Sequence, residues 1–137
     1  MAKTIRLDIV TPDKVAYSDD TNMVIARTTS GDIGILPGHA ALIAALVTWP
    51  LRIMTDNGGE IQVSLSGGFI EVQPEKITIL ANSAEMPSEI DILRAQSAKE
   101  RAESRLRASK ENVDVARAEA ALKRAMTRLT VAKSKKL

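Results

Sequence analysis

The segment Glu89-Ile90-Asp91-Ile92-Leu93-Arg94-Ala95 marks an abrupt change in the character of the chain. Before it, apolar residues alternate or cluster as they do in β-strands; after it, Ala, Lys, Arg and Glu recur at helical spacing. The charge changes sign at the same place. Up to Glu85 there are 6 Lys and Arg against 10 Asp and Glu, a net of −4, and from Met86 onward there are 13 against 7, a net of +6. We therefore predict two domains, residues 1–86 and residues 87–137.

Composition sets limits on both parts. A chain of 137 residues with 45% hydrophobic residues can bury a core, and a single Trp, Tyr and Phe make that core aliphatic. The absence of cysteine excludes disulfides and thiolate metal sites. The first residues lack the apolar segment of a signal peptide, so a cytosolic chain is expected.

Short strand-like segments fill the N-terminal part. Residues 5–10 alternate with period two, and Thr11-Pro12-Asp13 then indicates a turn. The hairpin signal Asp56-Asn57-Gly58-Gly59 offers residues that adopt positive φ easily. Further strands are predicted at 23–28, 51–55, 60–65, 69–72 and 76–80. This spacing, without helical patterns in between, predicts an antiparallel β-sandwich or barrel.

The uncharged segment 33–51 is long enough to cross a membrane. It contains Gly34, Pro37, Gly38 and Pro50, however, so its continuous apolar part covers only residues 40–49. A buried strand or bend is the better interpretation, and no direct insertion into a membrane is expected.

The C-terminal part reads as two helices. Ser88 followed by Asp91 has the form of a capping box, which predicts a first helix over about 89–108. Residues 109–112 interrupt the pattern, and a second helix is predicted over about 113–133. The apolar stripes expected on the two helices are Ile90, Leu93, Ala98, Ala102 and Leu106, and Val115, Ala118, Leu122, Ala125, Met126, Leu129 and Ala132.

The predicted fold is therefore α+β: an N-terminal antiparallel β-sandwich followed by a C-terminal antiparallel two-helix hairpin. Contacts between alanines bury little area, and burial contributes about 25 cal/mol per Å². We expect the hairpin to form readily but to hold only weakly to the sandwich, as a mobile element would.

Catalytic patterns are missing from the chain. The glycine-rich segment 31–39 lacks the Gly-Lys-Ser/Thr ending of a P-loop and is interpreted as a turn and bulge. His39 is the only histidine, which favours a structural or interface role. Ser66-Gly67-Gly68 lacks the Gly-x-Ser-x-Gly pattern and indicates a bulge or a close backbone approach. We expect a protein that is not an enzyme and holds no metal.

The arginines suggest a different kind of site. If the hairpin folds at about 110–112, Arg94, Arg101, Arg124 and Arg128 come within two turns of each other. At about 8 Å and an effective dielectric constant near 20, each pair would repel by roughly 2 kcal/mol, and solvent would reduce this considerably. A phosphate would relieve the repulsion. Alternatively, these arginines lie on solvated faces and pair with Glu100, Glu103, Glu111 and Glu119.

The order and spacing of four motifs resemble the ε-subunit family of bacterial F-type ATP synthases. The motifs are Val10-Thr11-Pro12-Asp13, Gly34-Ile35-Leu36-Pro37-Gly38-His39, Ser66-Gly67-Gly68-Phe69-Ile70-Glu71-Val72 and Ile90-Asp91-Ile92-Leu93-Arg94-Ala95. The resemblance covers essentially the whole chain and implies a non-catalytic rotor subunit on the cytoplasmic face of the plasma membrane. It implies a sandwich that binds the γ subunit and the c-ring, with Asp32 and His39 at the c-ring.

In this family the hairpin switches between a folded state on the sandwich and an extended state. The extended hairpin reaches the α and β subunits of the catalytic head and inhibits ATP hydrolysis. The resemblance implies that Lys123, Arg124 and Arg128 then face an acidic region of the β subunits. Pro87 stiffens the connection between the domains, with an effect on switching that has no predictable direction.

The ATP-sensing members of the family carry an Ile/Leu-Asp-x-x-Arg-Ala motif, which residues 90–95 match. The resemblance implies an ATP site, without a dedicated Mg²⁺ site. Its residues would be Glu85, Ile90, Asp91, Arg94, Ala95, Arg101, Arg124 and Arg128. Two alternatives compete with it. A structural rotor subunit could use the arginine face for protein contacts only. Nucleic-acid binding is disfavoured because the helices have no aromatic residue for base stacking.

Overall fold

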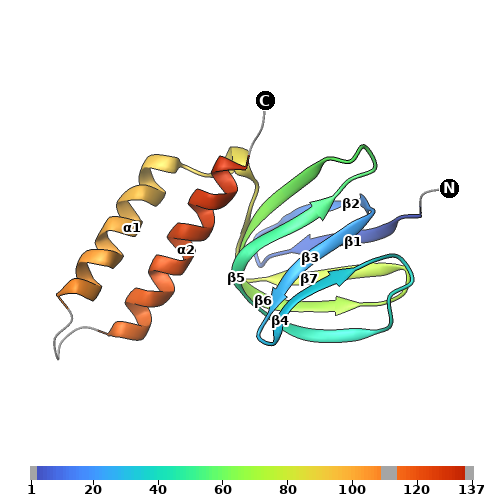
Figure 1. Ribbon diagram of the computed structural model, residues 1–137, viewed down its shortest axis with the longest axis horizontal. Coiled ribbons are helices and arrows are strands. Elements are labelled where there is room, and N and C mark those ends of the chain that lie inside the picture. Colours follow the sequence, from blue (N-terminus) through green and yellow to red (C-terminus); the bar gives the residue numbers. More distant parts are fainter. Residues whose placement is uncertain (1–2, 109–113, 135–137) are drawn as a thin grey trace.

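The computed structural model describes residues 3–108 and 114–134. A β-sandwich forms the N-terminal part, and two antiparallel helices lie along one side of it (Figure 1). This is the predicted α+β fold. The strands are β1 (Ile5–Val10), β2 (Val15–Thr21), β3 (Met23–Thr28), β4 (Gly31–Ile35), β5 (Leu42–Met54), β6 (Glu60–Val72), β7 (Lys76–Ala81) and β8 (Ala84–Glu85).

The strands follow the order β2-β1-β7-β6-β5-β3-β4, and β8 pairs with β6. All neighbours are antiparallel except β1 and β7, which run parallel. That pair is the one departure from the antiparallel pattern predicted. It arises because β7, which forms an antiparallel hairpin with β6, also pairs along its other edge with β1, the first strand of the chain. The long strands β5 and β6 pair along almost their whole length and link the two halves of the sandwich.

The core is aliphatic, as the composition predicts. Its fully buried side chains alternate along the strands, so that each strand turns one face inward. The largest of them are Ile5, Leu7, Ile9, Ile35, Leu51, Ile53, Ile70, Ile77 and Ile79. Burying each side chain of this size contributes about 1.5–3 kcal/mol, so the sandwich is the stable body of the molecule.

Two glycine motifs behave as predicted. Gly58, with φ of +73°, closes the β5–β6 hairpin. Gly68 has φ of +126°, and a Cβ atom there would lie 2.1 Å from the Leu80 carbonyl oxygen. The Ser66-Gly67-Gly68 motif therefore serves a close approach of β6 to β7.

The uncharged segment 33–51 is largely strand. It contains the end of β4 and most of β5, including Pro50, which stands opposite Ser64. Within residues 3–108 and 114–134, no helix is long and apolar enough to cross a membrane.

The connection between the domains differs from the prediction. The first helix does not begin at Glu89 with Ser88 as its cap. Pro87–Glu89 form a single 3-10 turn, η1, and Ile90 is extended. Helix α1 (Ile92–Arg107) then begins after Asp91, whose Oδ1 accepts a hydrogen bond from the Arg94 N–H at 3.0 Å. We call residues 86–91 the hinge.

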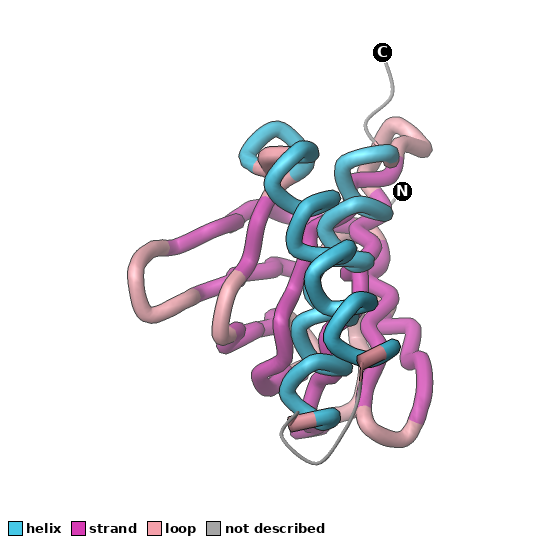
Figure 2. Tube along the Cα trace, turned by 90° about the vertical axis from the view of Figure 1, so that its left-hand side faces the viewer, coloured by secondary structure: helices cyan, strands magenta, loops and turns pink. Residues whose placement is uncertain are grey.

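The second helix, α2 (Val115–Lys133), begins two residues later than predicted, because Asp114 caps it by accepting from the Arg117 N–H at 3.0 Å. The predicted interruption at 109–112 and the fold of the hairpin at 110–112 lie outside the described residues. Figure 2 shows the two helices side by side in front of the strands. Helix α2 contacts both β5 and β6, whereas α1 packs chiefly on α2.

The predicted apolar stripes are only partly correct. Helix α1 buries just Ala95 and Ala102, and Leu93 is 81% exposed. Helix α2 buries Ala118, Ala125 and Leu129 as predicted, but also Thr127 and Val131, while Val115 and Met126 are exposed. The reason is that α2 packs on two neighbours, α1 and the sandwich, so its buried surface is wider than one stripe.

Candidate functional site

A pocket of about 400 Å³ lies where β8, the hinge, α1 and α2 meet. We call it the hairpin pocket. Its lining residues are Glu85, Glu89, Asp91, Arg94, Ala95, Ala98, Arg101 and Arg128. They come from the sandwich, the connection and both helices, so the pocket in this form depends on the docked position of the hairpin.

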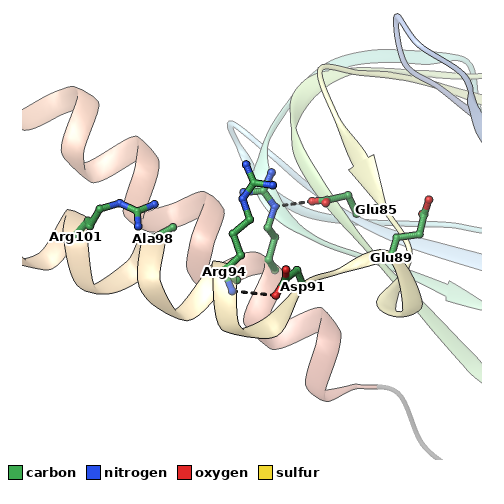
Figure 3. Close-up of a pocket in the computed structure, with 8 residues that line it drawn as sticks. Glu85, Glu89, Asp91, Arg94, Ala98 and Arg101 are labelled. Atoms are coloured by element: carbon green, nitrogen blue, oxygen red, sulfur yellow. Dashed lines mark hydrogen bonds and ion pairs between the residues drawn. The ribbon is translucent and has the colours of Figure 1, made fainter.

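Helical spacing places the α1 residues of the pocket. Arg94, Ala98 and Arg101 follow each other at intervals of four and three residues, which puts them on one face. The small side chains of Ala95 and Ala98 leave the space that the arginines border. Figure 3 shows Arg94 and Arg101 on the same helix with Ala98 between them, and Glu85 across the pocket on the sandwich.

One ion pair spans the pocket from the sandwich to the second helix. Arg128 of α2 donates its Nε–H to Glu85 Oε1 of β8 at 2.5 Å, and both side chains are about one-third exposed. This contact fixes the direction of the Arg128 guanidinium and ties α2 to the sandwich.

The other two arginines have no such partner. Within the described ranges, neither Arg94 nor Arg101 has an acidic oxygen within ion-pairing distance. Glu100, Glu103 and Glu119, which could have paired with the arginines, form no ion pair there either, and Glu111 lies outside the described residues. The pocket therefore presents two positive charges that an anion can neutralise.

Two of the three carboxylates in the pocket are engaged with groups outside α1. Glu85 binds Arg128, and Glu89 Oε2 accepts from Lys14 Nζ at 2.6 Å. Glu89 Oε1 accepts from the Met86 N–H at 2.8 Å. The Lys14 ammonium and then the Met86 N–H hold the pKa of the Glu89 carboxyl below its ordinary value. The third carboxylate, Asp91, caps α1.

The structure brings together most of the predicted ATP-site residues, but not all of them. Ile90 and Arg124 do not line the pocket. Ile90 is buried and lies in extended conformation between η1 and α1, and Arg124 is exposed one turn before Arg128 on α2. Glu89 was not among the predicted residues. The sequence pattern that could have indicated Glu89 is a Glu three residues after Met86. In a capping box, such a Glu accepts a hydrogen bond from the backbone N–H of the cap residue.

Within residues 3–108 and 114–134, no group of three or more His, Asp and Glu side chains is arranged to hold a metal ion.

The two residues predicted at the c-ring lie on β4 and in the turn after it, away from the hairpin pocket. Asp32 accepts two hydrogen bonds from Arg27, at 2.7 and 3.1 Å, and the Arg27 guanidinium lowers the pKa of the Asp32 carboxyl. Arg27 stacks on the Trp49 ring at 3.7 Å from its centroid. His39 Nδ1 bonds the Ala40 carbonyl oxygen at 2.7 Å.

An apolar patch, not predicted from the sequence, lies on the outer face of β5, β6 and β7. Ile43, Phe69 and Leu80 are 71%, 58% and 57% exposed, and they line a hollow of about 190 Å³. Phe69 stands directly opposite both Ala45 and Leu80 in the sheet. The alternation of strand residues could have predicted this patch. Ile70 and Ile79 are buried in the core, so their neighbours Phe69 and Leu80 lie on the opposite face. Large exposed apolar side chains gathered on one face are typical of a protein interface.

Comparison with known families assigns both parts of the chain. The family described as "ATP synthase, Delta/Epsilon chain, beta-sandwich domain" matches residues 4–87. The family described as "ATP synthase, Delta/Epsilon chain, long alpha-helix domain" matches residues 88–133.

Individual relatives agree with this assignment. The ATP synthase epsilon chain of Alkalihalophilus pseudofirmus is 54% identical over 109 residues, which cover 80% of this chain and 81% of the relative. The epsilon chain of Brevibacillus brevis is 50% identical over 100 residues, covering 73% and 76%.

Solved structures extend the likeness to the fold. A chain in the cryo-EM structure of the Euglena gracilis mitochondrial ATP synthase, OSCP/F1/c-ring, superposes with a TM-score of 0.80 and 26% identity, covering 95% of this chain and 81% of that chain. A chain in the central stalk/c-ring structure of the Tetrahymena thermophila mitochondrial ATP synthase has a TM-score of 0.52 and 17% identity, covering 96% and 95%. The second likeness concerns the fold alone.

Proposed function

Since the chain belongs to the ATP synthase Delta/Epsilon chain family and matches its epsilon chains over most of its length, we propose that it is a non-catalytic rotor subunit whose helical hairpin binds ATP. Bound ATP favours the docked hairpin, and the released hairpin inhibits ATP hydrolysis by the catalytic head.

The observation that carries the proposal is that Arg94 and Arg101 have no acidic partner among residues 3–108 and 114–134, in a pocket that Arg128 also lines. Guanidinium groups suit phosphate oxygens because their N–H donors lie in one plane. A triphosphate between them would touch both helices, while its base end lies near Glu85 on β8. A ligand in this position binds the docked state only, so it shifts the equilibrium toward that state by its difference in affinity.

The hairpin itself supports a switch. The buried residues of α1 are alanines, and the ion pair that joins α2 to the sandwich, Glu85–Arg128, is about one-third exposed. Helix α2 buries Ala118, Ala125, Thr127, Leu129 and Val131. Such an interface contributes little burial energy compared with the aliphatic core of the sandwich. Docking and release are then balanced closely enough for a ligand to decide between them.

The sandwich provides the surfaces for assembly. We assign the apolar patch of Ile43, Phe69 and Leu80 to the γ subunit, and Asp32 and His39 to the c-ring. With these partners the chain would be a peripheral subunit on the cytoplasmic face of the membrane, as part of the rotor. The released hairpin, with its excess of positive charge, reaches the α and β subunits of the head.

Calorimetric titration of the full chain with ATP and ADP tests the nucleotide site. We expect saturable binding that prefers ATP and is lost or weakened at least tenfold in Arg94→Ala and Arg101→Ala. Arg105→Ala is the matched control, because Arg105 is an exposed arginine on α1 outside the pocket. If the folded wild-type chain binds no nucleotide, the arginine face serves protein contacts and the subunit is a structural rotor component.

A further inference from the structure

Glu89 lines the hairpin pocket but contacts none of its arginines. Both of its carboxylate oxygens are used elsewhere. Oε1 accepts from the Met86 N–H at the start of the hinge, and Oε2 accepts from Lys14 Nζ at 2.6 Å. One side chain therefore closes the η1 turn and ties it to a lysine that lies 75 residues earlier in the chain.

Lys14, which binds Glu89, belongs to a hydrogen-bonded turn of the sandwich. It ends the turn between β1 and β2, in which the Thr11 Oγ1 accepts from the N–H groups of Asp13 and Lys14 at 3.3 and 3.2 Å. The backbone N–H of Thr11 also donates to the Lys14 carbonyl oxygen at 2.9 Å. The lysine is thus anchored on the rigid sandwich, while Glu89 belongs to the connection that must move when the hairpin leaves.

The position of η1 determines the position of the nucleotide site. Only Ile90 separates the turn from Asp91, which caps α1 and sets the helical phase of Arg94 and Arg101. A contact that fixes Glu89 on the sandwich therefore also fixes where α1 begins, and with it the positions of Arg94 and Arg101.

We propose that Lys14 and Glu89 form a positioning pair for the nucleotide site: their ion pair holds the hinge on the sandwich in the conformation that aligns the α1 arginines. This inference rests on the proposed function in that the ligand is ATP. The pair acts at the hinge and touches no ligand, so it sets the fraction of molecules that are ready to bind.

The apparent dissociation constant equals the intrinsic one divided by the fraction of the binding-competent state. Exposed ion pairs contribute about 0.2–1 kcal/mol, which corresponds to a change of about 1.4- to fivefold in that equilibrium. We expect Lys14→Met and Glu89→Gln each to weaken ATP binding by at most about fivefold, and the full factor is reached only where the binding-competent state is the minor one. The double variant should bind ATP about as tightly as the single variant with the lower affinity, because both changes remove the same interaction.

The sign of the Glu89→Gln effect separates positioning from simple charge. If Glu89 acted only through its negative charge, its removal would reduce repulsion of the triphosphate and tighten binding. Under the positioning role, binding weakens although a negative charge has been removed. Lys14→Arg should restore most of the affinity, and Lys76→Met is the control, because Lys76 pairs with Asp8 on the sandwich at similar exposure and does not touch the hinge.

A second measurement follows the hinge without ATP. The chain has no cysteine, so cysteines introduced at Asn57 and Ser97 accept spin labels on the sandwich and on α1. Lys14→Met should increase the population at undocked distances. The factor of this increase and the factor by which the affinity falls should multiply to the change in the docking equilibrium, at most about fivefold, whereas Lys76→Met should change neither. Tighter binding in Glu89→Gln, or unchanged affinity together with unchanged distances in Lys14→Met, would overturn the inference. A wild-type chain that binds no ATP overturns the proposed function, and the label distances still decide whether the pair holds the hinge.

Discussion

The side chain of Asp91 determines where α1 begins and thereby affects the geometry of the hairpin pocket. Its Oδ1 accepts from the Arg94 N–H and so satisfies one of the free donors at the start of α1. The same residue lines the hairpin pocket. A helix that begins one residue earlier or later would rotate Arg94 and Arg101 by about 100° around its axis, away from the position that they share with Arg128.

Two replacements of Asp91 distinguish the effect of its capping hydrogen bond from the effect of its negative charge. We expect Asp91→Ala to destabilise the first turn of α1 by about 1 kcal/mol, since the cap is lost. Asp91→Asn keeps an oxygen acceptor in the same place and should cost a few tenths of that. Hydrogen exchange of the amides of residues 93–96 measures the difference. Equal loss of protection in both variants would show that the negative charge, and not the cap, holds the turn.

At the scale of elements, the contact between α1 and α2 limits the size of the side chains that it accepts. Ala102 is 2% exposed where the helices meet, so Ala102→Leu must push them apart. We expect the packing of α1 on α2 to lose about 1–3 kcal/mol, with no change in the unfolding of the sandwich. Ala120→Leu adds the same side chain at an exposed position of α2 and serves as the control. Site-resolved hydrogen exchange checks this, and equal effects of the two variants would contradict it.

The sequence predicts best those elements whose conformation depends on local sequence, such as alternating strands and tight turns. Residues 23–28 were predicted as a strand with the bounds of β3, and Asp56–Gly59 as the turn of the β5–β6 hairpin. Strands β2 and β4 were missed for a physical reason. The first contains Ser18, Asp19 and Asp20 and the second two glycines, which are poor strand formers, and pairing with β1 and β3 determines their conformation.

The same distinction holds for the site. Antiparallel helices bring Arg94 level with Arg128, and the spacing along each helix makes this predictable. The Lys14–Glu89 pair is not predictable in this way, because it depends on how the sandwich turn and the hinge meet in three dimensions. Arg124 lies one turn from Arg128 on α2, as helical spacing predicts, but it does not line the pocket. Its role at the phosphates stays a prediction.

At the scale of the whole molecule, the two parts of the chain carry opposite net charge. The acidic sandwich, with a net charge of −4 up to Glu85, attracts the helical part, with a net charge of +6 from Met86 onward. This attraction favours docking at low ionic strength and weakens as salt screens it. Under the proposed function, this positive charge would face an acidic surface of the catalytic head in the released state.

The exposed cations of α2 allow the proposed inhibitory contact to be tested apart from the proposed nucleotide site. Lys123 and Arg124 are exposed and do not line the hairpin pocket, whereas Arg128 does. We expect Lys123→Glu/Arg124→Glu to weaken inhibition of ATP hydrolysis in the reconstituted enzyme by at least several-fold at low ATP, because like charges would then face each other. The control is Arg105→Glu/Arg107→Glu, which changes the net charge equally on α1. Equal loss in both variants would indicate a general effect of charge, and undiminished inhibition in the first would exclude an electrostatic contact through this face of α2.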